Sequence, residues 1–221
     1  MDITKQPDST PSRTERLRHS SAARRDAQRG RLRELLLTVA EQQLLEKGSG
    51  AFSLREVAEA TQYTPTTVYR HFRDRDALIG TILQKWFLAF ARVLDKADRF
   101  DAPPRERLLS LGDAYLRFAV AQPARYRVMF VDRTDIGVLP TEGSRIRDDP
   151  AFGVLFRVCE ALCGTGEAGS FQPMQASMII WLGLHGVAAM AVASQLLDAR
   201  AAQQVGMELL QITLSGLRVS A

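Results

Sequence analysis

A cluster of hydrogen-bonding side chains lies within six residues of the chain: Thr66, Thr67, Tyr69, Arg70 and His71. Such side chains can donate hydrogen bonds to phosphate oxygens or reach base edges in the major groove of DNA. If a helix begins just before them, its N-terminal N–H groups and the positive end of its dipole would also attract phosphate. The alternative is a small helical hairpin with a solvated polar face, and these residues alone leave both possibilities open.

The residues around this cluster predict two short helices that would hold it in place. Ser53 is a favourable N-cap, and Glu56 three residues later completes a capping box. Thr64 is predicted to cap the second helix, with Pro65 at the first helical position, where a missing N–H costs nothing. Residues 61–63 separate the two helices, which is about the length of a helix-turn-helix corner.

This stretch and its flanks resemble the N-terminal DNA-binding domain of the TetR family of transcriptional regulators, over roughly residues 30–85. Spacing and residue type agree with the family pattern across four predicted helices. The motifs are Glu46-Lys47-Gly48, Ser53 to Ala58, Val68-Tyr69-Arg70-His71-Phe72 and Asp74-Arg75-Asp76-Ala77-Leu78. Two positions depart from the pattern. Gln62 stands at the corner where glycine is usual, and Pro65-Thr66 opens the second helix where Lys-Gly is common, which leaves the operator sequence open.

The resemblance implies a set of DNA-contacting residues. Tyr69, His71 and Arg75 match family positions that contact phosphate. The candidates for base contacts are Thr66, Thr67 and Arg70. The full predicted DNA-binding set is Ser53, Arg55, Thr64, Thr66, Thr67, Tyr69, Arg70, His71 and Arg75.

The distribution of charge agrees with a polyanionic partner. The 221 residues carry a formal charge of +4. Residues 1–90 hold fifteen Lys and Arg against eleven Asp and Glu, whereas residues 91–221 hold fourteen of each, so the excess lies in the half with the predicted DNA-binding helices. The polar N-terminus predicts no signal peptide, and we expect a cytoplasmic protein. Residues 168–197 contain no charged side chain, but His185 and several polar residues within them favour a buried helix over a membrane span.

The predicted fold class is all-α. Residues 1–25 are expected to be a disordered basic tail. Residues 26–88 are expected to form a helix-turn-helix domain whose first helix runs from near Asp26 to Lys47. Residues 89–221 are expected to form a helical ligand-binding and dimerisation domain, with a linking helix between the two domains. The tail belongs to a basic run: Arg13, Arg16, Arg18, Arg24, Arg25, Arg29, Arg31 and Arg33. This run could follow DNA phosphates, or it could be a solvated leader, and both readings stay open.

The C-terminal half carries a second recognisable pattern. Phe118, Pro123, Tyr126 and Met129-Phe130, followed by Trp181-x-x-x-His185-Gly186, resemble a TetR-family subclass named for its Trp-His-Gly signature. The resemblance implies a regulatory, dimerising domain and names no ligand. The predicted ligand-binding set is Phe118, Tyr126, Met129, Phe152, Phe156, Met178, Trp181 and His185. The alternative is that these are core residues, with Trp181 and His185 a buried structural pair one helical turn apart.

The last two predicted helices, from about Pro173 to Arg200 and from about Ala202 to Val219, are the candidates for a dimer interface. Small residues on the first of them would allow close approach of a partner helix, and the resemblance implies a four-helix bundle with the symmetry mate. The predicted interface residues are Ala189, Val192, Leu196, Leu210, Leu214 and Leu217.

Taken together, these patterns predict a homodimeric repressor that leaves a near-palindromic double-stranded operator when a small-molecule effector binds. An activator of the same family is the first alternative. The second, from a different class, is a helical small-molecule-binding or enzymatic domain with a basic appendage. The sequence offers no nucleophile–base constellation, phosphate-binding glycine loop or metal-ligand cluster, so we expect no enzyme activity, no cofactor, no metal and no membrane. Cys159 and Cys163, four apart, are expected to be buried free thiols.

Overall fold

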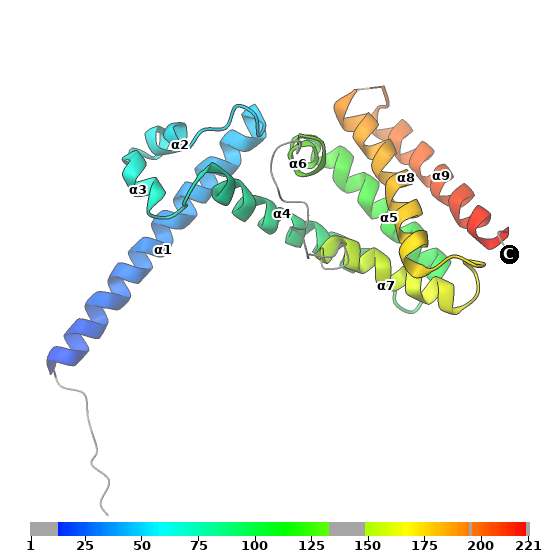
Figure 1. Ribbon diagram of the computed structural model, residues 1–221, viewed down its shortest axis with the longest axis horizontal. Helices are drawn as coiled ribbons and strands as arrows, with labels where there is room; N and C mark the ends of the chain where they lie inside the picture. The colour runs from blue at the N-terminus through cyan, green and yellow to red at the C-terminus, as the bar shows by residue number, and fades with distance from the viewer. Residues whose placement is uncertain (1–12, 133–148, 195, 220–221) are drawn as a thin grey trace, which may run out of the picture.

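The computed structural model describes residues 13–132, 149–194 and 196–219 of the 221-residue chain. Every regular element within these ranges is helical, which confirms the all-α prediction (Figure 1). In chain order the elements are α1 (Arg13–Lys47), α2 (Leu54–Thr61), α3 (Pro65–Tyr69), α4 (Arg75–Ala97), α5 (Pro104–Ala121), α6 (Pro123–Tyr126), the π-helix η1 (Arg127–Val131), α7 (Pro150–Gly164), α8 (Pro173–Ala193) and α9 (Ala199–Val219).

The C-terminal part of α1 packs with α2, α3 and the start of α4 around one small apolar core. Leu36, Leu44, Val57, Val68 and Leu78 are all fully buried in it. Burying a side chain of this size contributes about 1.5–3 kcal/mol. This core fixes α3 by its inner edge and leaves its outer edge in solvent.

Helix α4 is the linking helix that the sequence predicts. Its first turns, with Leu78 and Ile82, are buried in the N-terminal core, and Phe90 lies further along among the aromatic rings of α5 and η1. At its end, the buried Asp98 carboxylate accepts two hydrogen bonds from Arg107 of α5, at 2.7 and 2.9 Å. A change in the angle of α4 would therefore move residues in both halves of the molecule.

Helix α5 is the centre of the C-terminal bundle, because it packs against α4, α7, α8 and α9. Two glycines bring α5 and α9 close together. A methyl group at Gly112 of α5 would collide with Leu210, and one at Gly206 of α9 would collide with Leu116. Helix α8 lies along α9 and completes the bundle (Figure 1).

Two boundaries differ from the sequence-based expectation. Helix α1 begins at Arg13, so the tail predicted for residues 1–25 is helical from residue 13, and only residues 1–12 lie outside the described part. Arginine, alanine and glutamate there have high helix propensity, which outweighs the lack of an apolar stripe. The helix predicted from Pro173 to Arg200 ends at Ala193, because Asp198 caps a new helix by accepting from the Ala201 N–H at 2.7 Å.

Candidate functional site

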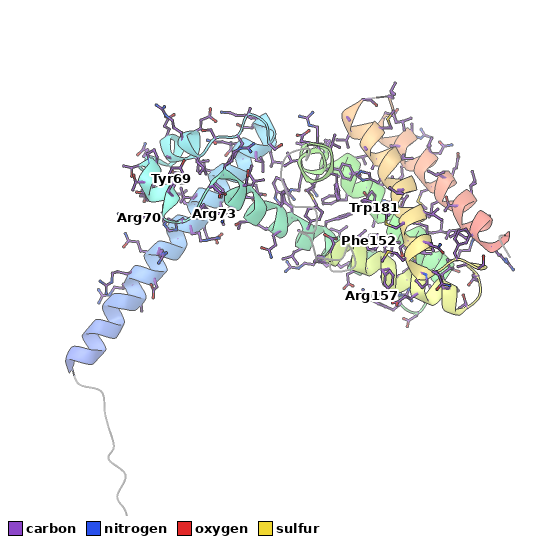
Figure 2. The ribbon with its side chains drawn as sticks, in the orientation of Figure 1. Tyr69, Arg70, Arg73, Phe152, Arg157 and Trp181 are labelled. Atoms are coloured by element: carbon purple, nitrogen blue, oxygen red, sulfur yellow. The ribbon has the colours of Figure 1, made fainter. Side chains whose placement is uncertain are left out.

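Helix α3 displays the polar cluster in solvent, as the sequence predicts. The Thr64 hydroxyl caps it by accepting from the Thr67 N–H at 3.3 Å, and Pro65 occupies its first turn. Tyr69 and Arg70 are exposed, Tyr69 at 55%. Thr66 is also exposed, whereas Thr67 and His71 are half-buried. Figure 2 shows Tyr69, Arg70 and Arg73 around α3, at the end of the molecule remote from the C-terminal bundle.

The corner before α3 keeps helix-turn-helix geometry without a glycine. Gln62 lies in the left-handed region, with φ 59° and ψ 28°, where it ends α2. Its N–H bonds to the Glu59 carbonyl and that of Tyr63 to the Ala58 carbonyl. A side chain in this conformation costs roughly 1–2 kcal/mol. The departure from the family pattern at Gln62 therefore leaves the turn intact and adds local strain.

Positive charge from α1 lies beside α3. The Arg33 guanidinium lies over the Phe72 ring, 4.7 Å from its centroid. Burial, followed by the charges of Arg29 and Arg33, lowers the pKa of His71 below its ordinary value. His71 is therefore a neutral hydrogen-bonding group at neutral pH, and the charge facing an anion here comes from the arginines.

The predicted DNA-binding residues outside α3 have mainly structural roles. Ser53 caps α2 by accepting from the Arg55 N–H at 3.2 Å, and Arg55 is exposed in an ion pair with Glu59. Arg75 donates from Nε to the Phe52 carbonyl at 3.1 Å and from its far end to the Ser49 carbonyl. Its guanidinium thus holds the α1–α2 loop against α4, and its phosphate contact stays a prediction.

One basic residue next to α3 was missed from the sequence. Arg73 directly follows the buried Phe72, and its side chain is 87% exposed in an ion pair with Asp74 at 2.7 Å. A surface ion pair of this kind contributes little to stability, so phosphate could replace Asp74 as its partner. The sequence does offer a signal for Arg73, because it is a basic residue that directly follows the last buried residue of the motif.

A network around Glu41 joins the N-terminal domain to the C-terminal bundle. The Glu41 carboxylate of α1 accepts from Trp86 Nε1 of α4 at 2.7 Å, from Arg125 of α6 at 3.1 Å and from Lys85 at 3.2 Å. The Arg125 guanidinium also lies over the Trp86 ring, 5.1 Å from its centroid. Burial raises the pKa of Glu41, but these hydrogen bonds and charges outweigh burial and hold the pKa below its ordinary value. The carboxylate is therefore charged and connects three helices from both halves.

A second contact crosses between the same two halves. The Ser49 hydroxyl, in the loop after α1, donates to the Asp132 carbonyl at 3.3 Å. Asp132 directly follows η1, and Arg125 lies in α6 just before η1. The α6–η1 segment therefore touches the N-terminal domain at both of its ends.

The inner side of the α6–η1 segment meets an aromatic cluster, defined here as Tyr115, Tyr126, Phe130, Trp181 and His185. The two tyrosine hydroxyls are 3.0 Å apart and lie 3.1 and 2.8 Å from His185 Nδ1. Trp181 stacks on His185 with centroids 5.2 Å apart, and Phe130 meets the same imidazole edge-on at 5.5 Å. Burial lowers the pKa of His185 and raises that of both tyrosines, so all three groups are neutral at neutral pH.

Comparisons with known proteins agree with this arrangement. Residues 36–82 match the family described as bacterial regulatory proteins, tetR family, and residues 108–213 match the family described as tetracyclin repressor-like, C-terminal domain. The two matches cover both halves of the molecule. The chain belongs to the TetR family of transcriptional regulators.

Individual relatives of this TetR-family chain are distant in sequence. An HTH-type transcriptional regulator of Mycobacterium tuberculosis is 27% identical over 148 residues, which are 66% of this chain and 60% of that protein. A solved structure from Rhodococcus sp. RHA1, of unknown function, superposes with a TM-score of 0.68 at 22% identity over 96% of this chain and 98% of its own. The transcriptional regulator FadR from Bacillus subtilis, in complex with stearoyl-CoA, gives a TM-score of 0.68 at 12% identity over 83% and 98% of the two chains. These structural likenesses concern the fold.

The predicted ligand-binding residues of this TetR-family chain fall into three groups. Tyr126, Trp181 and His185 lie in the aromatic cluster, and Phe152 packs edge-on against Trp181 at 6.3 Å. Phe118 lies outside the cluster, stacked on Phe90 at 4.5 Å. The remaining three are placed on η1, α7 and α8, where the first two are buried and the third half-buried: Met129, Phe156 and Met178. Tyr115 is a member of the cluster that the predicted ligand-binding set does not include, and the signal for it is that a buried tyrosine needs a partner for its hydroxyl.

A separate hollow of about 740 Å³ opens on the other side of α5, between α4 and α9. Phe118 is the one predicted ligand-binding residue that lines it. Asp113 and Arg117, paired at 2.8 Å, give this hollow a charged wall. It therefore differs in chemistry from the uncharged aromatic cluster.

Three of the six predicted dimer-interface residues are buried inside the protomer, so they cannot form part of its surface. Leu210, Leu214 and Leu217 are at most 3% exposed, because this edge of α9 packs on α5 inside the protomer. Ala189 and Val192 are half-buried, and Leu196, between α8 and α9, is 70% exposed. Helix α9 has apolar residues along two adjacent strips, and the strip predicted to form the interface is the one that packs in the core.

Other residues on the outer surface of α8 and α9 do expose apolar side chains. We define the α8–α9 face by its large exposed side chains: Ile179, Leu182, Met190, Val205 and Ile212, which are 39–69% exposed. Helices α4 and α8 both have the length and hydropathy of a membrane span, but α4 contributes buried side chains to both domains and α8 is one helix of a bundle. Exposed apolar side chains that gather in one patch are typical of association sites.

Two further sequence predictions concern cysteine and metal. Cys159 is buried as predicted, and burial raises the pKa of its thiol to about 12. Cys163 is only half-buried, and its thiol lies 3.4 Å from the Phe171 carbonyl. Among the described residues, no group of three or more His, Cys, Asp or Glu side chains is arranged to hold a metal ion.

Proposed function

We propose that this chain is a cytoplasmic, non-enzymatic repressor that binds a near-palindromic DNA operator as a homodimer and releases it when a small molecule binds the C-terminal bundle. The observation that carries the proposal is the outer edge of α3, where Thr66, Tyr69 and Arg70 are exposed. Because the chain belongs to the TetR family of transcriptional regulators, we infer that this edge faces DNA. The curated relatives are matched over only 60% of their length, so the operator and effector are argued from this chain alone.

The DNA-facing residues would divide into two kinds. Tyr69 and Arg73 flank the end of α3 and suit phosphate, which positions the protein without reading sequence. Thr66 and Arg70 lie on the exposed edge of α3 and suit base edges, where an arginine can bind guanine with two hydrogen bonds. Such a contact discriminates against the wrong base by about 1–3 kcal/mol.

The dimer would form through the α8–α9 face. One five-residue recognition helix contacts too few base pairs for useful specificity, so a second copy related by two-fold symmetry is needed. A two-fold interface uses the same patch on both protomers. The α8–α9 face is such a patch, since its large side chains are apolar and exposed on two adjacent helices.

The effector would act at the aromatic cluster. Its groups are neutral, so it suits a largely apolar, uncharged molecule that competes for hydrogen bonds with Tyr115, Tyr126 and His185. Displacing Tyr126 would shift α6, and with it the Arg125 contact to Glu41. An effector that binds the shifted state more tightly would change the position of α1 and α4, and hence the separation of the two α3 helices.

The proposal is tested by selecting duplexes from a random pool with the purified protein and measuring their affinity. We expect near-palindromic sites bound by one dimer. Arg70→Ala should weaken the selected site about 10–100-fold and relax preference at one position per half-site. Tyr69→Ala should weaken all duplexes similarly.

Arg92→Ala is the matched control, because it removes an exposed arginine from α4 at a position where we propose no DNA contact. It should bind like the wild type. If folded Tyr69→Ala and Arg70→Ala proteins keep wild-type affinity and preference, α3 does not contact DNA and the proposal is wrong. Increased transcription from the selected site in the presence of the protein would make it an activator.

A further inference from the structure

The N-terminal part of α1 extends well beyond the domain that α1 helps to build (Figure 1). The helix begins at Arg13, and from residue 23, where burial is described, the first fully buried side chain is Leu36. At 1.5 Å per residue, the part before Arg33 is about 30 Å long. Residues 23–31 are all exposed. Residues 23–31 are therefore not buried by the rest of the protomer.

The composition of this extension points to an anionic partner. Residues 23–33 contain five arginines and a single acid, Asp26. Their apolar residues are two alanines and Leu32, so the segment offers no apolar face to a protein partner. A helix without tertiary packing is marginal in water, and closely spaced arginines repel one another. A polyanion would relieve both costs.

Three arginines are aligned on the side of α1 that faces the DNA-binding domain. Arg25, Arg29 and Arg33 are four apart and share one helix face, defined here as the arginine stripe. Leu36 and Ala40 follow seven residues after Arg29 and Arg33, on the same face, and are buried against the other helices. The Arg33 guanidinium lies on Phe72, directly after α3. The stripe is thus continuous with the DNA-facing edge of the domain.

We propose that the arginine stripe binds the phosphates of operator DNA that flanks the bases contacted by α3. This rests on the proposed function of α3 and adds to it a longer footprint. The stripe is about 12 Å long, so with 3.4 Å per base pair it could follow roughly three to four base pairs beyond the recognition helix. The arginines would supply affinity and salt dependence, and the sequence of the flank would not be read.

The test compares two charge-matched double variants on opposite faces of the same helix. Arg25→Gln with Arg29→Gln alters the stripe, and Arg24→Gln with Arg31→Gln removes the same charge about half a turn away. Each is titrated with the selected operator, short or with twelve additional base pairs on both sides, at several salt concentrations.

The stripe variant should lose at least about tenfold in affinity for the long duplex at 100 mM salt, with the slope of log K against log salt reduced by about two per protomer. It should bind the short duplex nearly as well as the wild type does. The opposite-face variant should show less than half of these changes.

Two outcomes would overturn the inference while leaving the proposed function intact. One is a wild-type protein that binds long and short duplexes equally, and the other is an equal effect of both double variants. A wild-type protein that binds no duplex would instead refute the proposed function itself.

Discussion

The two halves of this protein place polar and apolar side chains in opposite positions. In the N-terminal domain the polar groups of α3 are exposed, and the interior around Leu36 and Val57 is mainly apolar, with the buried Thr61 hydroxyl bonded to the Val57 carbonyl. In the C-terminal bundle a polar triad of Tyr115, Tyr126 and His185 is inside, while the α8–α9 face is apolar and outside. An exposed polar helix edge suits a charged, reversible partner such as DNA. An exposed apolar face is stable only when covered, and a buried polar triad can exchange its hydrogen bonds with a ligand.

The largest expected effect comes from breaking the apolar exterior of the C-terminal half. Leu182→Glu together with Ile212→Glu places four carboxylates in the proposed dimer interface. Burying them is costly, so we expect the dimer dissociation constant to rise at least about 1,000-fold, equivalent to roughly 4 kcal/mol. Operator binding should be lost with it. Light scattering at micromolar concentration measures the first effect and duplex titration the second.

A matched control keeps this test specific. Gln204→Glu with Gln211→Glu adds the same charge to the polar side of α9, where both residues are exposed, and should remain dimeric. Leu214→Glu is not a suitable variant, because Leu214 is 1% exposed and its loss would unfold the protomer. A Leu182, Ile212 double variant that stays dimeric would show that α8 and α9 do not form the interface.

The next effect tests whether the two halves communicate through Glu41. Glu41→Gln keeps an acceptor for Trp86 but removes the charge that holds Arg125, which we expect to cost about 1–2 kcal/mol of unfolding free energy. Coupling is reciprocal, so operator binding should change hydrogen exchange in α6 and η1 of the wild type. In the variant this response should disappear.

The control for Glu41→Gln is a variant that breaks a different arginine–carboxylate pair, between Arg157 of α7 and Asp95 of α4. Arg157→Gln removes the 2.7 Å pair with Asp95, which lies wholly within the C-terminal half and is about half exposed. This variant should retain the exchange response. If operator binding leaves α6 unchanged in the wild type, the Glu41 network is only a structural joint.

A smaller effect concerns the buried polar triad. Burial lowers the pKa of His185 in the folded state, so below its ordinary pKa of 6.5 the unfolded chain binds more protons than the folded one. Stability from this group is complete above pH 6.5 and falls as the pH is lowered. We expect His185→Gln to remove part of the loss in stability between pH 7 and pH 5. Denaturant unfolding at fixed protein concentration measures it.

The second half-buried histidine provides the comparison for this experiment. The pKa of His71 is also lowered, so His71→Gln should remove its own contribution and leave that of His185 in place. A pH dependence of stability that is identical in the wild type and His185→Gln would mean that the triad takes up a proton without cost.

The sequence predicted the N-terminal domain better than the C-terminal one, for a physical reason. Caps at Ser53 and Thr64 and a single apolar stripe per helix are local signals, and the structure confirms the caps and the orientation of α3. The strip of α9 that meets α5 depends on Gly112 and Gly206 matching Leu210 and Leu116 across the bundle, which no local pattern reveals. The Glu41–Arg125 pair joins residues 84 apart for the same reason. The contacts of Arg75 with the α1–α2 loop could not be predicted either, because a basic residue at a helix start can bind a neighbouring loop as well as phosphate.

The smallest expected effect concerns the strained corner of the N-terminal domain. Gln62 holds a left-handed conformation that glycine adopts without penalty, while glycine loses more backbone entropy on folding. The strain of roughly 1–2 kcal/mol exceeds the entropic loss of about 0.5–1 kcal/mol, so Gln62→Gly should stabilise the protein slightly. Gln62→Ala keeps the Cβ and hence the strain, and should bring no gain. Thermal unfolding should give Gln62→Gly a Tm about 1–4 °C above that of Gln62→Ala. The reverse order would mean that the glutamine side chain itself stabilises the turn, and that the corner tolerates this residue through contacts rather than at the expense of strain.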